Sequence, residues 1–198
     1  MSNKKTIESY DAHIDEYING TTQVVSGHVK DWLDSSLDGL PKNARILEFG
    51  SAFGRDAAYI QDKGYSVECT DATPAFVKLL KSKGFNARQL NAITDDLPMG
   101  VNLLVANAVL LHFTRDETRH VARKVYDSLE NNGRFAFTLK KGTGESWSDT
   151  KLNAPRYFCY WARDDIKALL IDVGFNEPTI IEDSSDKWLQ IIAIKTAK

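Results

Sequence analysis

The segment 46–56, Ile-Leu-Glu-Phe-Gly-Ser-Ala-Phe-Gly-Arg-Asp, holds residues whose types and spacing could bind a nucleoside-containing ligand. An apolar run that predicts a strand includes Glu48, and the small-residue loop from Gly50 to Gly54 follows it. Such a loop lets the backbone approach a ligand, and the N-terminus of the next helix favours negative charge. Asp71 ends the second apolar run, where a carboxylate can accept both hydroxyls of an adenosine ribose. Together these residues predict a pocket for an adenosine-type ligand.

Two residues of this loop differ from a glycine-rich pattern. The dinucleotide-binding fingerprint needs a glycine where this chain has Arg55, and an arginine side chain disfavours tight packing of a pyrophosphate. Ala52 stands at the middle position, where its methyl group restricts positive backbone dihedral angles and crowds a ligand slightly. We expect ligand binding to survive this change.

Asp71 has a second interpretation, as a strand-end residue that caps the helix beginning at Thr73 and Pro74.

Strands and helices are expected to alternate and to place this loop at one edge of a parallel sheet. Capping signals support this, including Thr114 with Glu117 three residues later, before a helix that Asn132 and Gly133 stop. The last two strands are separated by the turn 183–186, which is short enough for an antiparallel hairpin. The expected strands are 44–49, 67–71, 87–90, 101–106, 134–139, 179–181 and 189–194, and the expected helices between them are 55–63, 74–84, 114–132 and 164–173.

The N-terminal segment also shows helical spacing of apolar and aromatic residues. We interpret residues 1–40 as a helical flap and residues 41–198 as the α/β core. With 198 residues, 42% of them hydrophobic, and no linker-like stretch, the chain suits a single domain spanning 1–198. The spaced positions are Ile7, Tyr10, Ile14 and Tyr17, then Val25, Val29, Trp32 and Leu33.

Charge and cysteine content narrow the classes of partner. The formal net charge is −2 and the basic residues are scattered, so nucleic acid is not the expected partner. Cys69 and Cys159 lack the spacing of a metal site and suit a reducing compartment. The N-terminus is polar where a secretory signal is apolar, and the apolar run 101–113 is too short to span a bilayer. We therefore expect a cytoplasmic protein, without metal or membrane association, that acts on a small molecule as a monomer or homodimer.

The segment 48–54 resembles motif I of class I S-adenosylmethionine-dependent methyltransferases, in which an acidic residue precedes three alternating glycines. Asp71 resembles the acidic residue after that family's second strand. The resemblance to small bacterial-type members extends from Ala44 to Lys195. It implies a doubly wound α/β fold with a Rossmann-like core: a mostly parallel seven-stranded sheet of order 3-2-1-4-5-7-6, with the last strand antiparallel and helices on both faces. Further similar segments are Asn91-Ala92-Ile93, 107–113, 129–134 and Gly174-Phe175.

The same resemblance implies S-adenosyl-L-methionine as cofactor and S-adenosyl-L-homocysteine as product. Glu48 would lie near the methionine amino group, and Asp71 would accept the ribose hydroxyls. Arg55 would pair with the methionine carboxylate, although a surface salt bridge with Asp56 is the alternative. Tyr17 would cover the cofactor, although tyrosines at this spacing are more often simply packed. The full predicted cofactor set is Glu48, Gly50, Ser51, Ala52, Gly54, Arg55, Asp71, Ala72, Thr73, Asn91, Ala92, Ile93, Asn107 and Tyr17.

The methyl transfer implied by this resemblance depends mainly on positioning and desolvation, because a positively charged sulfur already supplies the driving force. A general base is needed only if the acceptor atom must lose a proton. His112 is the one histidine expected near the pocket, and it is our candidate for that base. Its alternative role is to anchor the turn after the fourth strand through a backbone hydrogen bond.

Two segments could border the methyl acceptor. The polar loop 140–155 follows the fifth strand on the cofactor side of the sheet, and its Trp147 could cover an apolar substrate or belong to a solvated connection. The aromatic segment 156–161 could clamp an aromatic or carboxylated acceptor, or form an ordinary edge strand against the last helix. The candidate acceptor-binding residues are Tyr10, Trp147, Arg156, Tyr157 and Tyr160.

The leading hypothesis is methyl transfer to an oxygen or nitrogen atom of a small-molecule acceptor. One alternative is methylation of a modified tRNA base, because similar N-terminal and motif I sequences occur in that branch. A second is a protein that binds the cofactor without chemistry, which Ala52 leaves open. A third, a nicotinamide-dependent oxidoreductase, is disfavoured by Arg55 and by the C-terminal hairpin.

Overall fold

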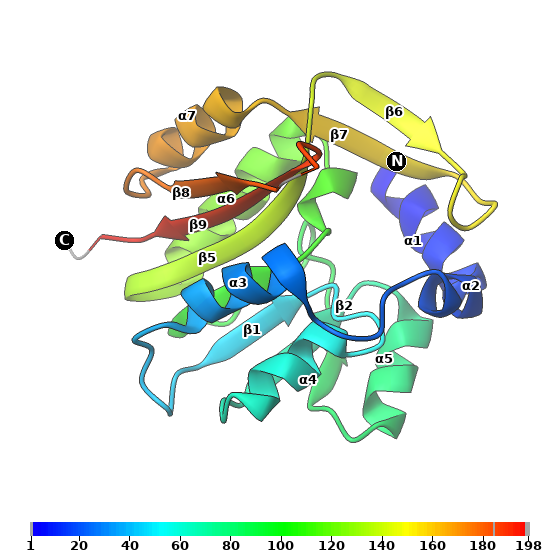
Figure 1. The fold of residues 1–198 in the computed structure, drawn as a ribbon, viewed down its shortest axis with the longest axis horizontal. Helices are drawn as coiled ribbons and strands as arrows, with labels where there is room; N and C mark the ends of the chain where they lie inside the picture. Colours follow the sequence, from blue (N-terminus) through cyan, green and yellow to red (C-terminus); the bar gives the residue numbers. More distant parts are fainter. Residues whose placement is uncertain (1, 184, 197–198) are drawn as a thin grey trace.

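The computed structural model of this chain describes residues 2–183 and 185–196, and its centre is a nine-stranded sheet (Figure 1). Five parallel strands run in the order β3-β2-β1-β4-β5. β5 pairs antiparallel with β9, which in turn pairs antiparallel with β8. The strand bounds are β1 Ile46–Phe49, β2 Val67–Asp71, β3 Ala87–Gln89, β4 Val101–Ala106, β5 Leu129–Lys141, β6 Glu145–Ser148, β7 Arg156–Trp161, β8 Thr179–Glu182 and β9 Trp188–Ile194.

This arrangement confirms the predicted doubly wound, mostly parallel sheet. The seven predicted strands correspond to β1–β5, β8 and β9, and their observed order β3-β2-β1-β4-β5-β9-β8 is the predicted order 3-2-1-4-5-7-6. The sheet has nine strands rather than seven because β6 and β7 form an additional pair. The predicted turn 183–186 includes Ser184, which lies outside the described residues.

The prediction of a polar loop over 140–155 is wrong for β6. This strand pairs antiparallel with β7, and β7 pairs in parallel with the last two residues of β5, beyond the end of β4. The sequence Glu145–Ser148 has no apolar face that would indicate a strand, so its conformation comes from pairing with β7. The edge-strand interpretation of 156–161 is also wrong in one respect, because β6 covers the outer edge of β7.

The boundary between α6 and β5 differs from the expected position. The helix begins with the predicted capping box of Thr114 and Glu117 but ends at Ser128, and β5 starts at once. Leu129 pairs with Val101, and the backbones of Asn132 and Gly133 exchange hydrogen bonds with Lys195. Sheet pairing therefore overrides the helical spacing that continues as far as Leu129.

The core lies in two layers, one on each face of the sheet. Leu104 in β4 faces the layer under α6 and α7, whereas the neighbouring Leu103 and Val105 face the layer under α3, α4 and α5. Such burial on both faces is typical of central parallel strands. No helix in the described part of the chain is long and apolar enough to cross a bilayer. The helix bounds are α1 Ser2–Ala12, α2 Ile14–Asn19, α3 Gly27–Leu37, α4 Arg55–Asp62, α5 Pro74–Ser82, η1 Leu110–His112, α6 Arg115–Ser128 and α7 Arg163–Val173.

The N-terminal helices take up two different places. In α3, Trp32 and Leu33 are buried in the sheet core, and the Trp32 indole donates a hydrogen bond to the backbone oxygen of Ile191 at 3.2 Å. In contrast, α1 and α2 lie apart from α3, beside the β6–β7 hairpin and near α5 (Figure 1). The helices that can cover a site at the carboxyl ends of the strands are therefore α1 and α2.

Candidate functional site

The loop Gly50–Gly54 connects β1 to α4, and its backbone needs left-handed conformations. Gly50 has a φ of +60°, and a Cβ there would come within 2.5 Å of Val109 Cγ2. Gly54 has a φ of +88° and caps the N-terminus of α4. Ala52 adopts a φ of +48°, a conformation that costs a residue with a side chain about 1–2 kcal/mol. The loop thus keeps a glycine-type shape with a strained alanine at its middle.

Asp71 holds this loop in place from the end of β2. Its Oδ2 accepts a hydrogen bond from the Ala52 amide and its Oδ1 accepts one from the Thr73 amide, each at 2.9 Å. Burial raises the pKa of the Asp71 carboxyl above its usual value. Each carboxylate oxygen has a second lone pair. Asp71 therefore caps the start of α5, as one interpretation predicted, and can also accept hydroxyls of a ligand.

Two cavities adjoin the loop and share Tyr17, Gly50, Ala52, Asn107 and Ala108. The first cavity has a volume of about 90 Å³ and the second about 420 Å³. We call the loop Gly50–Gly54 together with Glu48 and Asp71 the floor. The predicted residues that line the first cavity are Tyr10, Tyr17, Gly50, Ala52, Asp71, Ala72, Thr73, Asn91, Ala92, Asn107 and His112. Those that line the second are Tyr17, Glu48, Gly50, Ser51, Ala52, Arg55 and Asn107.

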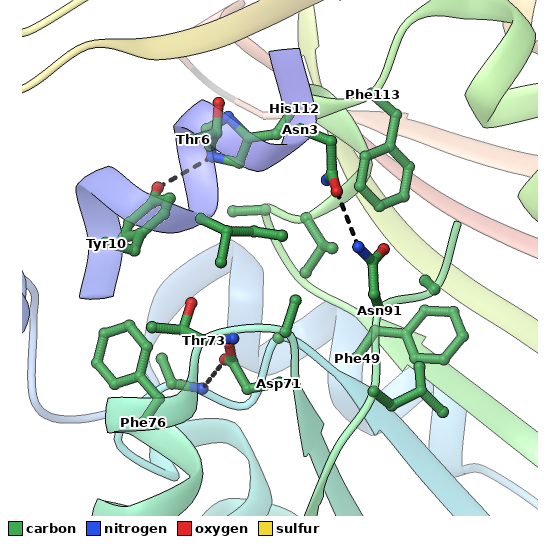
Figure 2. A pocket seen from close by; sticks show the side chains of 18 of the residues that line it. Asn3, Thr6, Tyr10, Phe49, Asp71, Thr73, Phe76, Asn91, His112 and Phe113 are labelled. Carbon is green, nitrogen blue, oxygen red and sulfur yellow. Dashed lines mark hydrogen bonds between the residues drawn. The ribbon is translucent and has the colours of Figure 1, made fainter. Parts of the chain in front are cut away.

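Helix α1 closes the first cavity on the side opposite Asp71 and Thr73, and we call it the roof (Figure 2). Figure 2 shows Asn3 and Tyr10 of the roof pointing at Asn91 and His112 on the rim. Each of these contacts is a hydrogen bond made by a side chain of α1, unlike the backbone pairing that joins strands in a sheet. The bonded pairs are Asn3 with Asn91, Thr6 with Tyr157, Ser9 with Pro155, Tyr10 with His112 and Asp11 with Ala75.

Glu48 is a buried carboxyl at the second cavity. Burial and the nearby charge of Asp56 raise its pKa to about 8. Within the described part of the chain, its Oε2 is buried without a hydrogen-bond partner, and the buried Ser51 Oγ also has none. Buried polar atoms usually have partners. The two atoms therefore suit a polar, hydrogen-donating group of a ligand next to the loop.

A chain of hydrogen bonds joins the second cavity to three elements. Asp56 in α4 accepts from the Asn107 amide at 2.7 Å, and the Asn107 oxygen accepts from the Thr138 hydroxyl at 2.9 Å. Thr138 Oγ1 in turn accepts from the Ala108 amide at 2.8 Å. This network fixes Asn107 after β4. The sequence analysis did not predict Asp56 or Thr138 as a site residue. For Thr138, the one feature of the sequence that could have indicated such a role is a hydroxyl side chain within an otherwise apolar run.

Arg55 lines the second cavity, but its guanidinium already has partners. Its Nε donates to Asp56 Oδ1 at 2.7 Å and its Nη1 to the Thr22 oxygen at 3.4 Å. The Asp56 pair is the alternative that the sequence left open. The geometry thus places a neutralised pair, rather than a free cation, beside the loop.

His112 is buried with both ring nitrogens engaged. Its Nδ1 lies 2.6 Å from the Tyr157 backbone oxygen, and because a carbonyl can only accept, Nδ1 carries the proton. Its Nε2 then accepts from the Tyr10 hydroxyl at 2.9 Å. Burial lowers the pKa of His112 to about 3, so the ring is neutral. The backbone anchor is therefore present, and Nε2 could accept a proton once Tyr10 moves away.

The predicted acceptor-binding residues are divided between the roof and the hairpin. Arg156 Nη1 donates to the Tyr10 hydroxyl at 3.2 Å, next to the first cavity. Trp147 lies on β6 with 47% of its surface exposed, and the Tyr157 ring packs against it. The hydroxyl of Tyr160 lies 3.3 Å from Ser146 Oγ. Trp147, Tyr157 and Tyr160 line neither cavity.

Several residues at the site carry no clear signal in the sequence. Gly54 and Ile93, which were predicted, line neither cavity, whereas apolar side chains from five separate segments line the first. Their positions depend on how distant segments meet, which spacing along the chain does not reveal. Among the described residues, no group of three histidine, cysteine, aspartate or glutamate side chains is arranged to hold a metal ion. The additional apolar lining residues of the first cavity include Ile7, Phe49, Phe76, Leu90, Val109 and Phe113.

Comparison with known proteins identifies the fold. No protein-family model and no curated protein matches the sequence, whereas many solved structures match the chain. The 1,6-didemethyltoxoflavin-N1-methyltransferase of Burkholderia thailandensis, with bound 1,6-didemethyltoxoflavin and S-adenosylhomocysteine, is similar over 98% of this chain and 90% of its own, with a TM-score of 0.72 at 18% identity. This chain has the class I methyltransferase fold.

Two further structures have the class I methyltransferase fold or resemble it. The magnesium protoporphyrin IX methyltransferase of Synechocystis, with bound S-adenosylhomocysteine, has a TM-score of 0.67 at 14% identity, over 92% of this chain and 94% of its own. A Bordetella parapertussis structure described as a "possible exported protein" has a TM-score of 0.68 at 14% identity, over 83% of this chain. This chain spans 66% of the length of that protein. At these identities the likeness concerns the fold alone.

Proposed function

We propose that this chain is an S-adenosylmethionine-dependent methyltransferase that methylates an oxygen or nitrogen atom of a small molecule. The observation that carries this proposal is the floor, where two buried carboxyls, Glu48 and Asp71, stand on either side of one glycine-type loop at the carboxyl ends of parallel strands. The class I methyltransferase fold supports the same assignment.

The two cavities would divide the cofactor between them. Asp71, with free lone pairs, would accept the ribose hydroxyls in the first cavity, where Asn91 and Ala92 would border the adenine. Glu48 and Ser51 would bind the methionine amino group in the second cavity, because a nearby ammonium favours the charged form of Glu48. The residues present thus fit the cofactor in charge and hydrogen bonding.

The roof would have to move for binding. Ligand pockets usually measure about 300–1,000 Å³, and the first cavity provides about 90 Å³. Its closing contacts are side-chain hydrogen bonds, among them Tyr10 to His112. Each such bond contributes about 1 kcal/mol, so opening the roof would cost up to about 5 kcal/mol for the five bonds, which binding of the ligand would have to offset.

When bound, S-adenosylmethionine supplies a methyl group on a positively charged sulfur, which leaves as a neutral thioether. The chain's own residues would hold the reactants in line and exclude water. If the acceptor atom carries a proton that must leave, His112 Nε2 would take it after Tyr10 withdraws. Loss of the Tyr10 hydrogen bond raises the pKa of His112, because that bond stabilises the neutral ring.

The direct test is incubation of the purified protein with methyl-labelled cofactor and fractionated small-molecule extracts. We expect label to appear in one or a few metabolites and not in tRNA, because the net charge is −2. His112→Ala should lower the turnover on such a metabolite about 100-fold if a base is needed. Full turnover by His112→Ala would remove the base assignment, and labelling of tRNA alone would favour the nucleic-acid alternative.

A further inference from the structure

Arg156 is a buried cation next to Tyr10 at the first cavity, and it has no acidic partner among the described residues. Its side chain is on β7, and the residue is 6% exposed. Its Nε is buried without any hydrogen-bond acceptor, and Arg156 forms no ion pair with any carboxylate that the structure describes. A buried charge is strongly unfavourable unless it is paired. The guanidinium is therefore poised to receive an anion.

Aromatic rings hold this guanidinium at the roof. Its central carbon lies 5.7 Å from the centre of the Tyr10 ring and 5.1 Å from that of Phe158, distances at which a cation is attracted to the ring. Its Nη1 donates to the Tyr10 hydroxyl. A guanidinium fixed in this way presents a fork of donors that matches a carboxylate or phosphate.

Two lysines add to the positive charge around Arg156. Lys140 Nζ lies 4.5 Å from the centre of the Phe158 ring, and Lys151 Nζ lies 4.3 Å from that of Tyr17. Neither forms an ion pair within the described part of the chain. Burial lowers the pKa of Lys151, and the charges of Arg156 and Arg55 lower it further. An anion placed among these groups would relieve their mutual repulsion.

From these contacts we infer that the methyl acceptor carries a carboxylate or phosphate group, which binds Arg156 and takes the place of the Tyr10 hydroxyl. This inference rests on the proposed function. Because Tyr10 bonds both Arg156 and His112, its displacement would also free His112 Nε2. Binding of the correct acceptor and release of the candidate base would thus be one event.

The cofactor's own carboxylate is a less suitable occupant of this site. Arg156 lines neither cavity, and the methionine portion would lie in the second one, whose lining already includes the cations Arg55 and Lys151. Arg156 instead contacts Tyr10, and Tyr10 and His112 both line the first cavity, where Asp71 lies on the opposite side. Arg156 therefore lies next to the first cavity, on the side of Tyr10 and His112, and its contacts are with the roof.

Calorimetry of the S-adenosylhomocysteine-loaded protein with benzoate, phenyl phosphate and uncharged benzamide tests this inference. We expect at least one anion to bind about tenfold more tightly than benzamide. Arg156→Gln should abolish that preference while the affinity for S-adenosylhomocysteine stays within about twofold. The matched control is Lys141→Gln, which removes a cation paired with Glu182 and Asp186 on the surface and should change neither affinity. Which anion binds better tells whether the acceptor's group is a carboxylate or a phosphate.

Three results would overturn the inference. The first is equal binding of all three probes, or none at about 10 mM. The second is an unchanged anion preference in Arg156→Gln. The third is a loss of S-adenosylhomocysteine affinity in Arg156→Gln as large as the loss for the anions, which would assign Arg156 to the cofactor. If Arg156→Gln does not fold, Arg156→Lys keeps the charge without the fork and should still weaken the anion by about fivefold. Failure of the wild type to bind S-adenosylhomocysteine would refute the proposed function, and the same titrations on the cofactor-free protein would then test the anion site by itself.

Discussion

The floor and the roof enclose the same cavity but are built in different ways. The floor is held mainly through the backbone: Asp71 binds two main-chain amides, and Gly50 leaves no room for a side chain. The roof is held by side-chain hydrogen bonds to segments distant in the sequence, such as Tyr10 to His112. The difference suggests a rigid part that would recognise an invariant cofactor and a movable part that would recognise the acceptor.

The largest effect that sharpens this comparison is expected from Asp71→Ala. The change removes the proposed ribose acceptor and also frees the Ala52 and Thr73 amides. We expect the affinity for S-adenosylhomocysteine to fall about 100-fold, which corresponds to about 2.7 kcal/mol. Calorimetry measures this affinity. The control variant Asp34→Ala removes a carboxylate in α3 and should leave the affinity unchanged. Wild-type affinity in Asp71→Ala would refute the ribose assignment.

Gly50→Ala tests whether the floor is as rigid as its contacts indicate. The added methyl would lie 2.5 Å from Val109 Cγ2 in a left-handed conformation. At Gly84, with a φ of +85°, no atom of the described residues lies within 4 Å of the position that a Cβ would take. We expect Gly50→Ala to destabilise folding by about 2–3 kcal/mol and Gly84→Ala by about 1 kcal/mol in urea unfolding. Equal losses of stability in the two variants would mean that the floor shifts to accommodate the methyl group.

The pH dependence of folding stability tests the protonation state of Glu48, the buried carboxyl of the floor at the second cavity. The pKa of Glu48 rises from 4.5 to about 8 on folding because of burial and Asp56. The folded state therefore binds more protons, and the stability contributed by Glu48 is lost as pH rises through about 8. The lowered pKa of His112 acts in the opposite direction, but below pH 6.5.

Between pH 6.5 and 8, we accordingly expect the urea midpoint of the wild type to fall. The midpoint of Glu48→Gln, which cannot ionise, should change less over that range. Urea unfolding at a series of pH values gives both curves. A midpoint that rises with pH in this window would show that Glu48 is ionised in the folded protein.

Tyr10→Phe tests the roof and has the smallest expected effect. It removes the hydrogen bonds that the hydroxyl makes with His112 and Arg156 and keeps the ring. A net loss of about 1 kcal/mol in the closed state should speed S-adenosylhomocysteine association about fivefold. The pKa of His112 should rise above about 3, because its neutral form loses a partner. Stopped-flow fluorescence and histidine NMR measure the two effects; an unchanged association rate would mean that Tyr10 does not hold the roof closed.

The sequence predicted the floor better than the roof for a physical reason. Asp71 and the loop Gly50–Gly54 follow directly from strand ends, so local pattern and sheet geometry together bring them to one edge. Ala52 adopts a positive φ despite the restriction that its methyl group imposes. The apolar runs predicted where the strands lie, whereas the order of the strands in the sheet came from the resemblance to class I methyltransferases.

The roof depends on contacts between distant segments. Nothing in the local sequence shows that Tyr10 bonds His112, 102 residues away, or that Arg156 lies beneath the same tyrosine. β6 was missed because its residues are polar and its pairing with β7 alone makes it a strand. Asp56 was considered only as a partner of Arg55, although it also fixes Asn107.

Calorimetric titration of the wild-type protein with S-adenosylmethionine, S-adenosylhomocysteine and NAD tests the central assignment most directly. The preformed floor should give saturable binding of both sulfur-containing ligands at one site per chain and no binding of NAD. Absence of binding by both sulfur-containing ligands, or binding of NAD in their place, would contradict the account.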